Sequence, residues 1–164
     1  MVIPTLNPFG ILVIILMVIL YACGVAGDVP MQDTIAPTVE ANADVVYVSA
    51  RETSNDDAGS TWTFAVTVAH PDTGWEDYAD GWDVVLPDGT VIKPDADSPF
   101  TRLLLHPHET EQPFTRSQSG IVIPVGVTRV IVRAHDLVDG FGGREIEVDL
   151  SVASGADFDV TRLP

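Results

Sequence analysis

Apolar and polar residues alternate with a period of two along most of the chain after residue 43. The clearest case is "TWTFAVTVAH", residues 61–70, where large apolar side chains alternate with small or polar ones. Such alternation is typical of an antiparallel strand with one buried face. The face expected to be buried carries Trp62, Phe64, Val66 and Val68.

Shorter alternating segments follow, separated by turn signals such as "PDG" and "PVG". In the first segment, strict alternation places Val45, Tyr47 and Ser49 on one face. The predicted strands are residues 44–52, 61–70, 82–86, 90–93, 101–105, 114–123, 128–136 and 144–150.

These segments predict an all-β domain over residues 44–150. Parallel βαβ units are excluded, because no connection contains an amphipathic run of helix length. Two sheets packed face to face allow every strand to bury its apolar face. We therefore expect an Ig-like or fibronectin-III-like antiparallel β-sandwich, with Trp62 between the sheets. The tail, residues 151–164, either adds an edge strand or stays loose.

The N-terminal segment, residues 1–27, carries no charged side chain. From Pro8 its apolar run is about 20 residues long, enough to cross a hydrocarbon core about 30 Å thick as a helix. We expect a single transmembrane helix at the bacterial inner membrane, with the C-terminal domain in the periplasm or outside. Residues 28–43 contain Pro30 and Pro37 and are expected to form an extended linker.

This N-terminal segment has two alternative interpretations, a lipoprotein signal and a cleaved secretory signal. "LYAC", Leu20 to Cys23, resembles the bacterial lipobox, which predicts acylation of Cys23 and a lipid anchor instead of a helix. A cleaved secretory signal would require a basic N-terminal region and a shorter apolar stretch. Cys23 is the only cysteine of the chain, so an intramolecular disulfide is excluded.

Acidic residues dominate the rest of the chain, which has 24 Asp and Glu against 8 Lys and Arg and a net charge of −16. Such a surface repels nucleic acid, because it cannot replace the counterions of the phosphates. Cationic groups or divalent ions are its natural partners.

Two histidines stand out in "LLLHPHETEQPFTRS", residues 103–117. His106 and His108 flank a proline, so in an extended backbone both rings point the same way. A third ligand from His70 or His135 would complete a zinc or copper site. The alternative, which we favour, is that they are ordinary loop histidines bonded to the backbone.

The segment "HPDTGWEDYADGWD", residues 70–83, is rich in acids. Oxygen ligands on a loop suit Ca²⁺, although a solvated acidic loop is the simpler interpretation. The acids are Asp72, Glu76, Asp77, Asp80 and Asp83. The predicted contacts to a protein partner are Trp75, Tyr78, Phe114 and Arg116. Arg116 is also expected to form a salt bridge with Asp77 or Asp80.

No catalytic signature accompanies these residues: the sequence has no nucleophile elbow, no phosphate-binding glycine loop and no thiol in the domain. We therefore do not expect an enzyme, nor a cofactor beyond a divalent metal ion. The expected function is that of an accessory subunit docking on a larger membrane protein complex. The alternative is a periplasmic metal-binding module.

Three motifs, "GWEDYADGW", "LLLHPHETEQPFTRS" and "RAHDLVDGFGG", resemble a family of small anchored or secreted bacterial proteins of unknown function. The resemblance covers Asp44 to Leu150. It implies a bacterial, extracytoplasmic location and transfers no catalytic residue.

Overall fold

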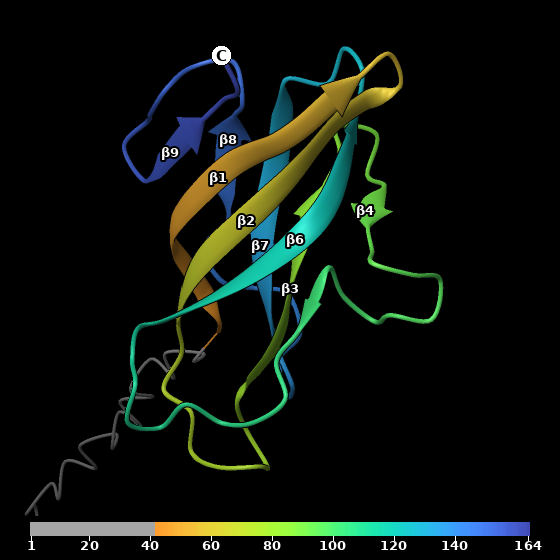
Figure 1. The fold of residues 1–164 in the computed structure, drawn as a ribbon. Coiled ribbons are helices and arrows are strands. Elements are labelled where there is room, and N and C mark those ends of the chain that lie inside the picture. The colour runs from red at the N-terminus through yellow and green to blue at the C-terminus, as the bar shows by residue number, and fades with distance from the viewer. Residues whose placement is uncertain (1–41) are drawn as a thin grey trace, which may run out of the picture. The chain divides into compact units, whose positions relative to one another are not determined.

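Nine strands make up the part of the chain that the computed structural model describes, residues 42–164 (Figure 1). Each of the eight predicted segments overlaps one of them, and the ninth lies in the tail. The strands are β1 (Asp44–Asp56), β2 (Gly59–Ala69), β3 (Ala79–Val85), β4 (Val91–Ile92), β5 (Arg102–Leu103), β6 (Phe114–Pro124), β7 (Arg129–Asp136), β8 (Ile146–Asp149) and β9 (Phe158–Thr161).

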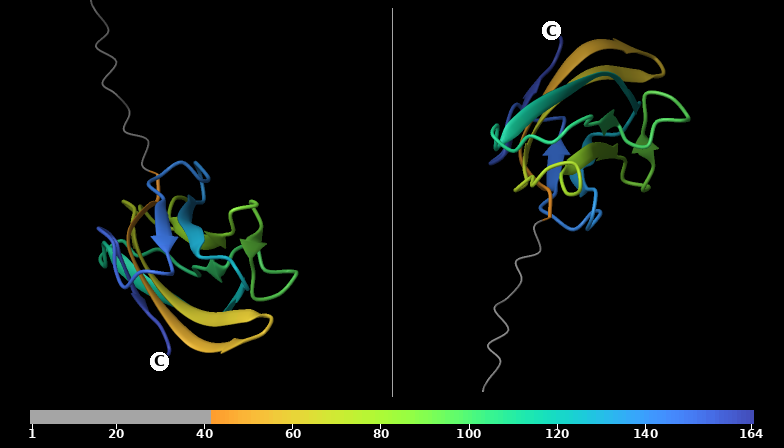
Figure 2. Two further views of the ribbon diagram at one scale, coloured as in Figure 1. Left: turned by 90° about the horizontal axis from the view of Figure 1, so that it is seen from above. Right: turned by 90° about the horizontal axis from the view of Figure 1, so that it is seen from below.

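The strands form two sheets, one in the order β6-β2-β1-β9 and the other in the order β4-β3-β7-β8, with β5 paired to β3. All pairings are antiparallel except that of β1 with β9. Viewed end-on, the orange and yellow β1–β2 hairpin lies in one layer and the green and blue strands of the second sheet in the other (Figure 2). The predicted all-β fold with two packed sheets is confirmed.

The predictions for the N-terminus concern residues outside the described part of the chain. The apolar segment of residues 1–27, Cys23 and nearly all of the linker precede residue 42. Within residues 42–164 no helix has the length and apolar character needed to span a membrane.

A single hydrophobic core lies between the two sheets. Trp62, Phe64, Val66 and Val68 of β2 are all buried, as their alternation predicts. The second sheet contributes another set of buried side chains from alternate positions, which explains why it packs face to face with the first. This second set comprises Trp82, Val84, Val130, Val132, Ile146 and Val148.

The strict alternation predicted for β1, with Val45 and Tyr47 on one face, is wrong at the start of the strand. The register of β1 against β2 shifts between Val45 and Tyr47, where a β-bulge adds one residue. As a result Val45 and Val48 are buried, whereas Tyr47 is exposed. The bulge changes the phase of the alternation, so a strict period of two fails there.

A second bulge changes the phase of β6. Trp62 pairs with Ile121 and Thr63 with Ser119, so Gly120 is the extra residue. Its φ of 78° lies in the left-handed region, which glycine adopts without a steric penalty. The bulge turns Ile121 and Ile123 toward the core.

The tail completes the first sheet. β9 runs parallel to β1, with Val48 opposite Phe158 and Arg51 opposite Thr161. Val160 is buried against the core. The tail therefore forms an edge strand, the first of the two alternatives left open by its sequence.

Candidate functional site

Residues from two sheets and two loops meet at one end of the sandwich. His70 directly follows β2, and Asp136 is the last residue of β7. The loop between β2 and β3 and the loop between β5 and β6 lie at the same end (Figure 1). We use "His70 cluster" for His70, Asp72, Asp77 and Asp136.

The imidazole of His70 is fully buried between carboxylates. Its Nδ1 lies 2.7 Å from Asp72 Oδ1, and its Nε2 lies 3.0 Å from Asp136 Oδ2 and 3.7 Å from Asp77 Oδ1. Burial by itself lowers the pKa of His70, but the hydrogen bonds and charges of Asp72 and Asp136 outweigh burial and raise the pKa. A carboxylate at each ring nitrogen favours the protonated imidazole, in which both N–H groups donate hydrogen bonds.

Asp72 connects the imidazole of His70 to the neighbouring loops. Its Oδ1 also accepts a hydrogen bond from the backbone N–H of Ala79 at 3.2 Å. Its Oδ2 accepts one from the backbone N–H of His108 at 2.5 Å. At the other side, Asp136 Oδ1 accepts the N–H of Val138 at 2.8 Å. The cluster therefore ties the ends of β2 and β7 to the start of β3 and to the β5–β6 loop.

The histidines predicted as metal ligands lie in different environments. His106 is exposed, and its Nδ1 is 2.9 Å from the carbonyl oxygen of Pro107. His108 is buried and stacks on Phe114, with ring centroids 3.7 Å apart. Burial, followed by the charges of Arg116 and His106, lowers the pKa of His108. Its Nδ1 has no hydrogen-bond partner among residues 42–164 and lies 3.7 Å from Asp72 Oδ2.

A different set of residues converges closely enough to hold a metal ion. Among residues 42–164, the ligand atoms of His70, Asp77 and Asp136 all lie within 4.8 Å of one another. This group contains neither His106 nor His108. The other proposed third ligand, His135, is paired with Asp80 at 2.6 Å. Asp136 was missed by sequence reasoning, and its position at the end of a predicted strand was the only available signal.

The acidic side chains of residues 70–83, which were candidate Ca²⁺ ligands, have several different partners. Asp72 and Asp77 join the His70 cluster, whereas Asp80 binds His135. Asp83 is buried, accepts the N–H of Thr101 and pairs with Arg133 at 3.2 Å. Glu76 points to solvent. The five acids therefore do not surround one point.

The predicted partner contacts are also separated. Trp75 is 67% exposed and packs edge-on against Tyr78, with ring centroids 6.0 Å apart. Phe114 is a buried core residue under His108 and offers no surface to a partner. Arg116 pairs with Glu111 at 2.9 Å instead of Asp77 or Asp80, a correction to the predicted salt bridge. Glu111 lies closer along the chain, in the loop that leads into the strand of Arg116.

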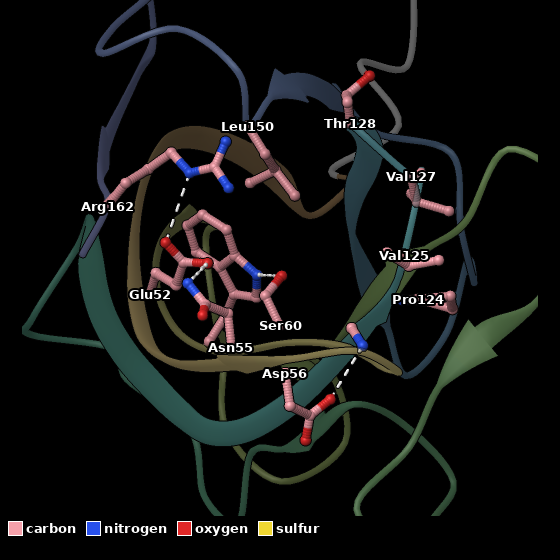
Figure 3. Close-up of a pocket in the computed structure, with 13 residues that line it drawn as sticks. Glu52, Asn55, Asp56, Ser60, Pro124, Val125, Val127, Thr128, Leu150 and Arg162 are labelled. Atoms are coloured by element: carbon pink, nitrogen blue, oxygen red, sulfur yellow. Dashed lines mark hydrogen bonds and ion pairs between the residues drawn. The ribbon is translucent and has the colours of Figure 1, made fainter. Parts of the chain in front are cut away.

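The opposite end of the sandwich contains a pocket of about 250 Å³ (Figure 3). Trp62 lines it and donates a hydrogen bond from Nε1 to Ser60 Oγ at 2.6 Å. Glu52 also lines the pocket, and its carboxylate oxygen lies 3.4 Å from Arg162 Nε. The same carboxylate accepts the N–H of Leu163 at 3.1 Å. No local motif predicts this pair, because 110 residues separate Glu52 from Arg162.

The pH dependence of this contact can be tested with Glu52→Gln. Burial raises the pKa of Glu52, but hydrogen bonds from Leu163 N–H and Arg162 outweigh burial and lower the pKa below its ordinary value of 4.5. The ionised carboxylate therefore stabilises the fold above pH 4.5, and this contribution disappears as the pH falls through the lower, folded-state pKa. We expect Glu52→Gln to cost about 1 kcal/mol at neutral pH.

Urea unfolding at pH 7 and in acid measures this difference between wild type and variant. Glu147→Gln is a matched control, since Glu147 forms an exposed pair with Arg129 and its loss should cost about 0–1 kcal/mol. A cost for Glu52→Gln that stayed constant into strong acid would contradict the role of the ionised carboxylate.

The chain is similar in sequence to a protein of an archaeal species. The chain is 41% identical over 106 residues to a Halomicrobium mukohataei protein named "Putative lipoprotein". The match covers 65% of this chain and 47% of that protein, so the chain spans about half the length of its relative. No protein-family model matches the chain. No solved structure matches it.

Proposed function

We propose that this chain is a non-catalytic, membrane-anchored domain that works outside the cytoplasm as an accessory subunit docking on a larger membrane protein complex. The observation that carries the proposal is an exposed apolar patch beside the His70 cluster. We define the loop patch as the exposed Trp75, Leu137 and Val138 together with Tyr78, which is half-buried between them and the domain. A cluster of large apolar side chains exposed to solvent is typical of a protein contact site.

The members of the loop patch are neighbours through specific contacts. Trp75 packs against Tyr78, and the carbonyl oxygen of Tyr78 accepts the N–H of Leu137 at 3.1 Å. Trp75 and Val138 are 67% and 61% exposed. The Asp136–Val138 hydrogen bond links the patch to the His70 cluster, which holds its two loops in place. A rigid aromatic anchor on a fixed loop loses little entropy on binding.

The anchor is proposed from the N-terminal sequence together with the relative. The apolar run of residues 8–27 is long enough for a helix, and "LYAC" resembles a lipobox. The name of the Halomicrobium protein supports the second form, in which Cys23 carries the lipid. Either anchor would hold the acidic domain on the outer face of the membrane.

We also propose that the domain is Ig-like. The strand order supports this proposal: β1, β2 and β6 share one sheet, while β4, β3, β7 and β8 share the other. These positions correspond to strands A, B and E against C′, C, F and G of Ig-like sandwiches. The disulfide of antibody domains has no counterpart, because Cys23 is the only cysteine.

The non-catalytic part of the proposal is supported by the bonding of His70. Both of its ring nitrogens lie against carboxylates and its side chain has no exposed surface, so His70 is not presented to a substrate as a general base. The alternative function predicted from sequence, metal binding through His106 and His108, lacks a third converging ligand among residues 42–164.

The anchor can be tested by fractionating cells that produce the full chain. We expect the protein in carbonate-washed membranes, because an apolar span or a lipid chain resists the wash. Cys23→Ser separates the two anchors: a helix retains the variant in the membrane, whereas a lipoprotein loses its acyl chain. The intact mass of the purified protein reports acylation directly. Recovery of wild type in the soluble fraction would contradict both anchors.

Docking can be tested by crosslinking in intact cells, followed by detergent extraction and identification of the attached subunits. We expect Trp75→Ala to reduce the yield of the crosslinked complex at least 10-fold, as for loss of a binding hot spot worth about 2 kcal/mol. Val125→Ala is the matched control, since Val125 is equally exposed at the opposite end of the domain. Equal yields from the two variants would contradict docking through the loop patch.

A further inference from the structure

We infer that His70, Asp77 and Asp136 form a binding site for one divalent transition-metal ion of the zinc class. The ligand atoms are His70 Nε2, Asp77 Oδ1 and Asp136 Oδ2, and Asp72 orients the imidazole from its other nitrogen. This inference goes beyond the docking proposal and does not depend on it.

The spacing of the three atoms suits a tetrahedral ion. Bonds of 2.0–2.2 Å to nitrogen and carboxylate oxygen place neighbouring tetrahedral ligands about 3.3–3.5 Å apart. Nε2 of His70 is 3.0 Å from Asp136 Oδ2 and 3.7 Å from Asp77 Oδ1, so the two distances bracket this spacing. The third distance, between the two carboxylate oxygens, is within 4.8 Å, so rotation of the carboxylate side chains would bring the three atoms to this spacing.

The other side of His70 has the partner that a metal-binding histidine requires. A ligating imidazole almost always donates its second N–H to a carboxylate or a carbonyl, which sets the tautomer and ring orientation. Asp72 Oδ1 lies 2.7 Å from Nδ1, and neither side chain has any exposed surface. Asp72 is itself held by the N–H groups of Ala79 and His108. The orientation of the imidazole is therefore fixed before an ion binds.

The charge of the cluster also favours a divalent ion. Three carboxylates surround one imidazole, and those of Asp72 and Asp136 are almost fully buried. A proton on His70 supplies one positive charge, whereas a divalent ion with a neutral ring supplies two. Buried like charges repel strongly at low dielectric, so the larger compensation is preferred. The imidazole ligand selects zinc, copper or nickel over magnesium and calcium.

Access to the ion is through Asp77. His70 and Asp136 have side chains exposed by 0% and 1%, whereas that of Asp77 is exposed by 34%. Asp77 lies on the β2–β3 loop beside Trp75. Three protein ligands with one solvent-facing side leave a fourth position for water or for a group of a docked partner.

The test is a calorimetric titration of the full chain, kept in detergent, with Zn²⁺ as the only added metal ion. We expect one ion per chain and a Kd below about 10 μM, corresponding to about −7 kcal/mol. Asp77→Asn should weaken binding at least 10-fold, since it removes a charged ligand. The variant should fold, because the backbone of Asp77 makes its turn contacts with Thr73 and Gly74. Glu76→Gln, in the same loop but outside the cluster, is the matched control and should bind as wild type does.

Co²⁺ provides an independent readout, because its visible absorption intensifies in a tetrahedral site. We expect this band in wild type and Glu76→Gln and its loss in Asp77→Asn. The inference is overturned if wild type binds no Zn²⁺ at 100 μM, or if Asp77→Asn and Glu76→Gln bind alike. Binding that survives Asp77→Asn but is lost in a His106→Ala, His108→Ala variant would place the ion at the sequence-predicted ligands and also overturn it.

Discussion

Trp62→Ala should lower the free energy of unfolding by about 3–5 kcal/mol, the usual cost of truncating a large buried aromatic side chain. The indole is 1% exposed and lies between the sheets, with its ring centroid 6.4 Å from that of Phe64. Its removal would join the new space to the pocket at that end of the domain, so water would reach the core (Figure 3). The hydrogen bond to Ser60 would also be lost.

Urea unfolding followed by far-UV circular dichroism measures this loss. Trp75→Ala is the matched control, because it removes the same side chain from an exposed loop and should change stability by less than about 0.5 kcal/mol. Similar effects for the two variants would mean that Trp62 does not fill the space between the sheets.

Asp72→Ala should cost a comparable amount, about 3–5 kcal/mol, through a different mechanism. The substitution leaves Nδ1 of His70 without its carboxylate inside the protein. It also removes the acceptor of two backbone N–H groups, those of Ala79 and His108. Breaking a buried ion pair from one side is costly, because the remaining charge has neither water nor a partner.

The same urea experiment tests this prediction, with Glu76→Ala as a control from the same loop. Glu76 is exposed, so its truncation should cost less than about 0.5 kcal/mol. Hydrogen exchange adds spatial detail: in Asp72→Ala, the amides of Ala79 and His108 should lose protection. A small cost together with unchanged protection would show that Asp72 does not hold the loops.

The strands of this domain could be predicted from the sequence because their signal is local. Successive side chains of a strand point to opposite faces, so the apolar residues of 61–70 identify a buried face without reference to any partner. Ile146 and Val148 of β8 alternate in the same way and are also buried. This rule, together with the turn signals and the absence of amphipathic runs of helix length, predicted the approximate positions of eight strands and the two-sheet fold.

Register depended on strand pairing, which the period of two does not contain. The bulges before Tyr47 and at Gly120 arise because one strand has a residue more than its partner. Likewise, β9 became a strand through pairing with β1, since its own four residues carry too little pattern. Register and bulges depend on two paired strands, so the sequence of one strand does not predict them.

The candidate site shows the same division between sequence and tertiary structure. The sequence by itself determined that histidines and acids gather near the strand ends, and that Trp75 lies among them. Only the tertiary structure decided that His70 meets Asp136, 66 residues away, while His106 remains in solvent. It also buried Phe114 beneath His108. The physical reason is that alternation orients each side chain relative to its own strand, whereas the order of strands in the two sheets determines which side chains become neighbours.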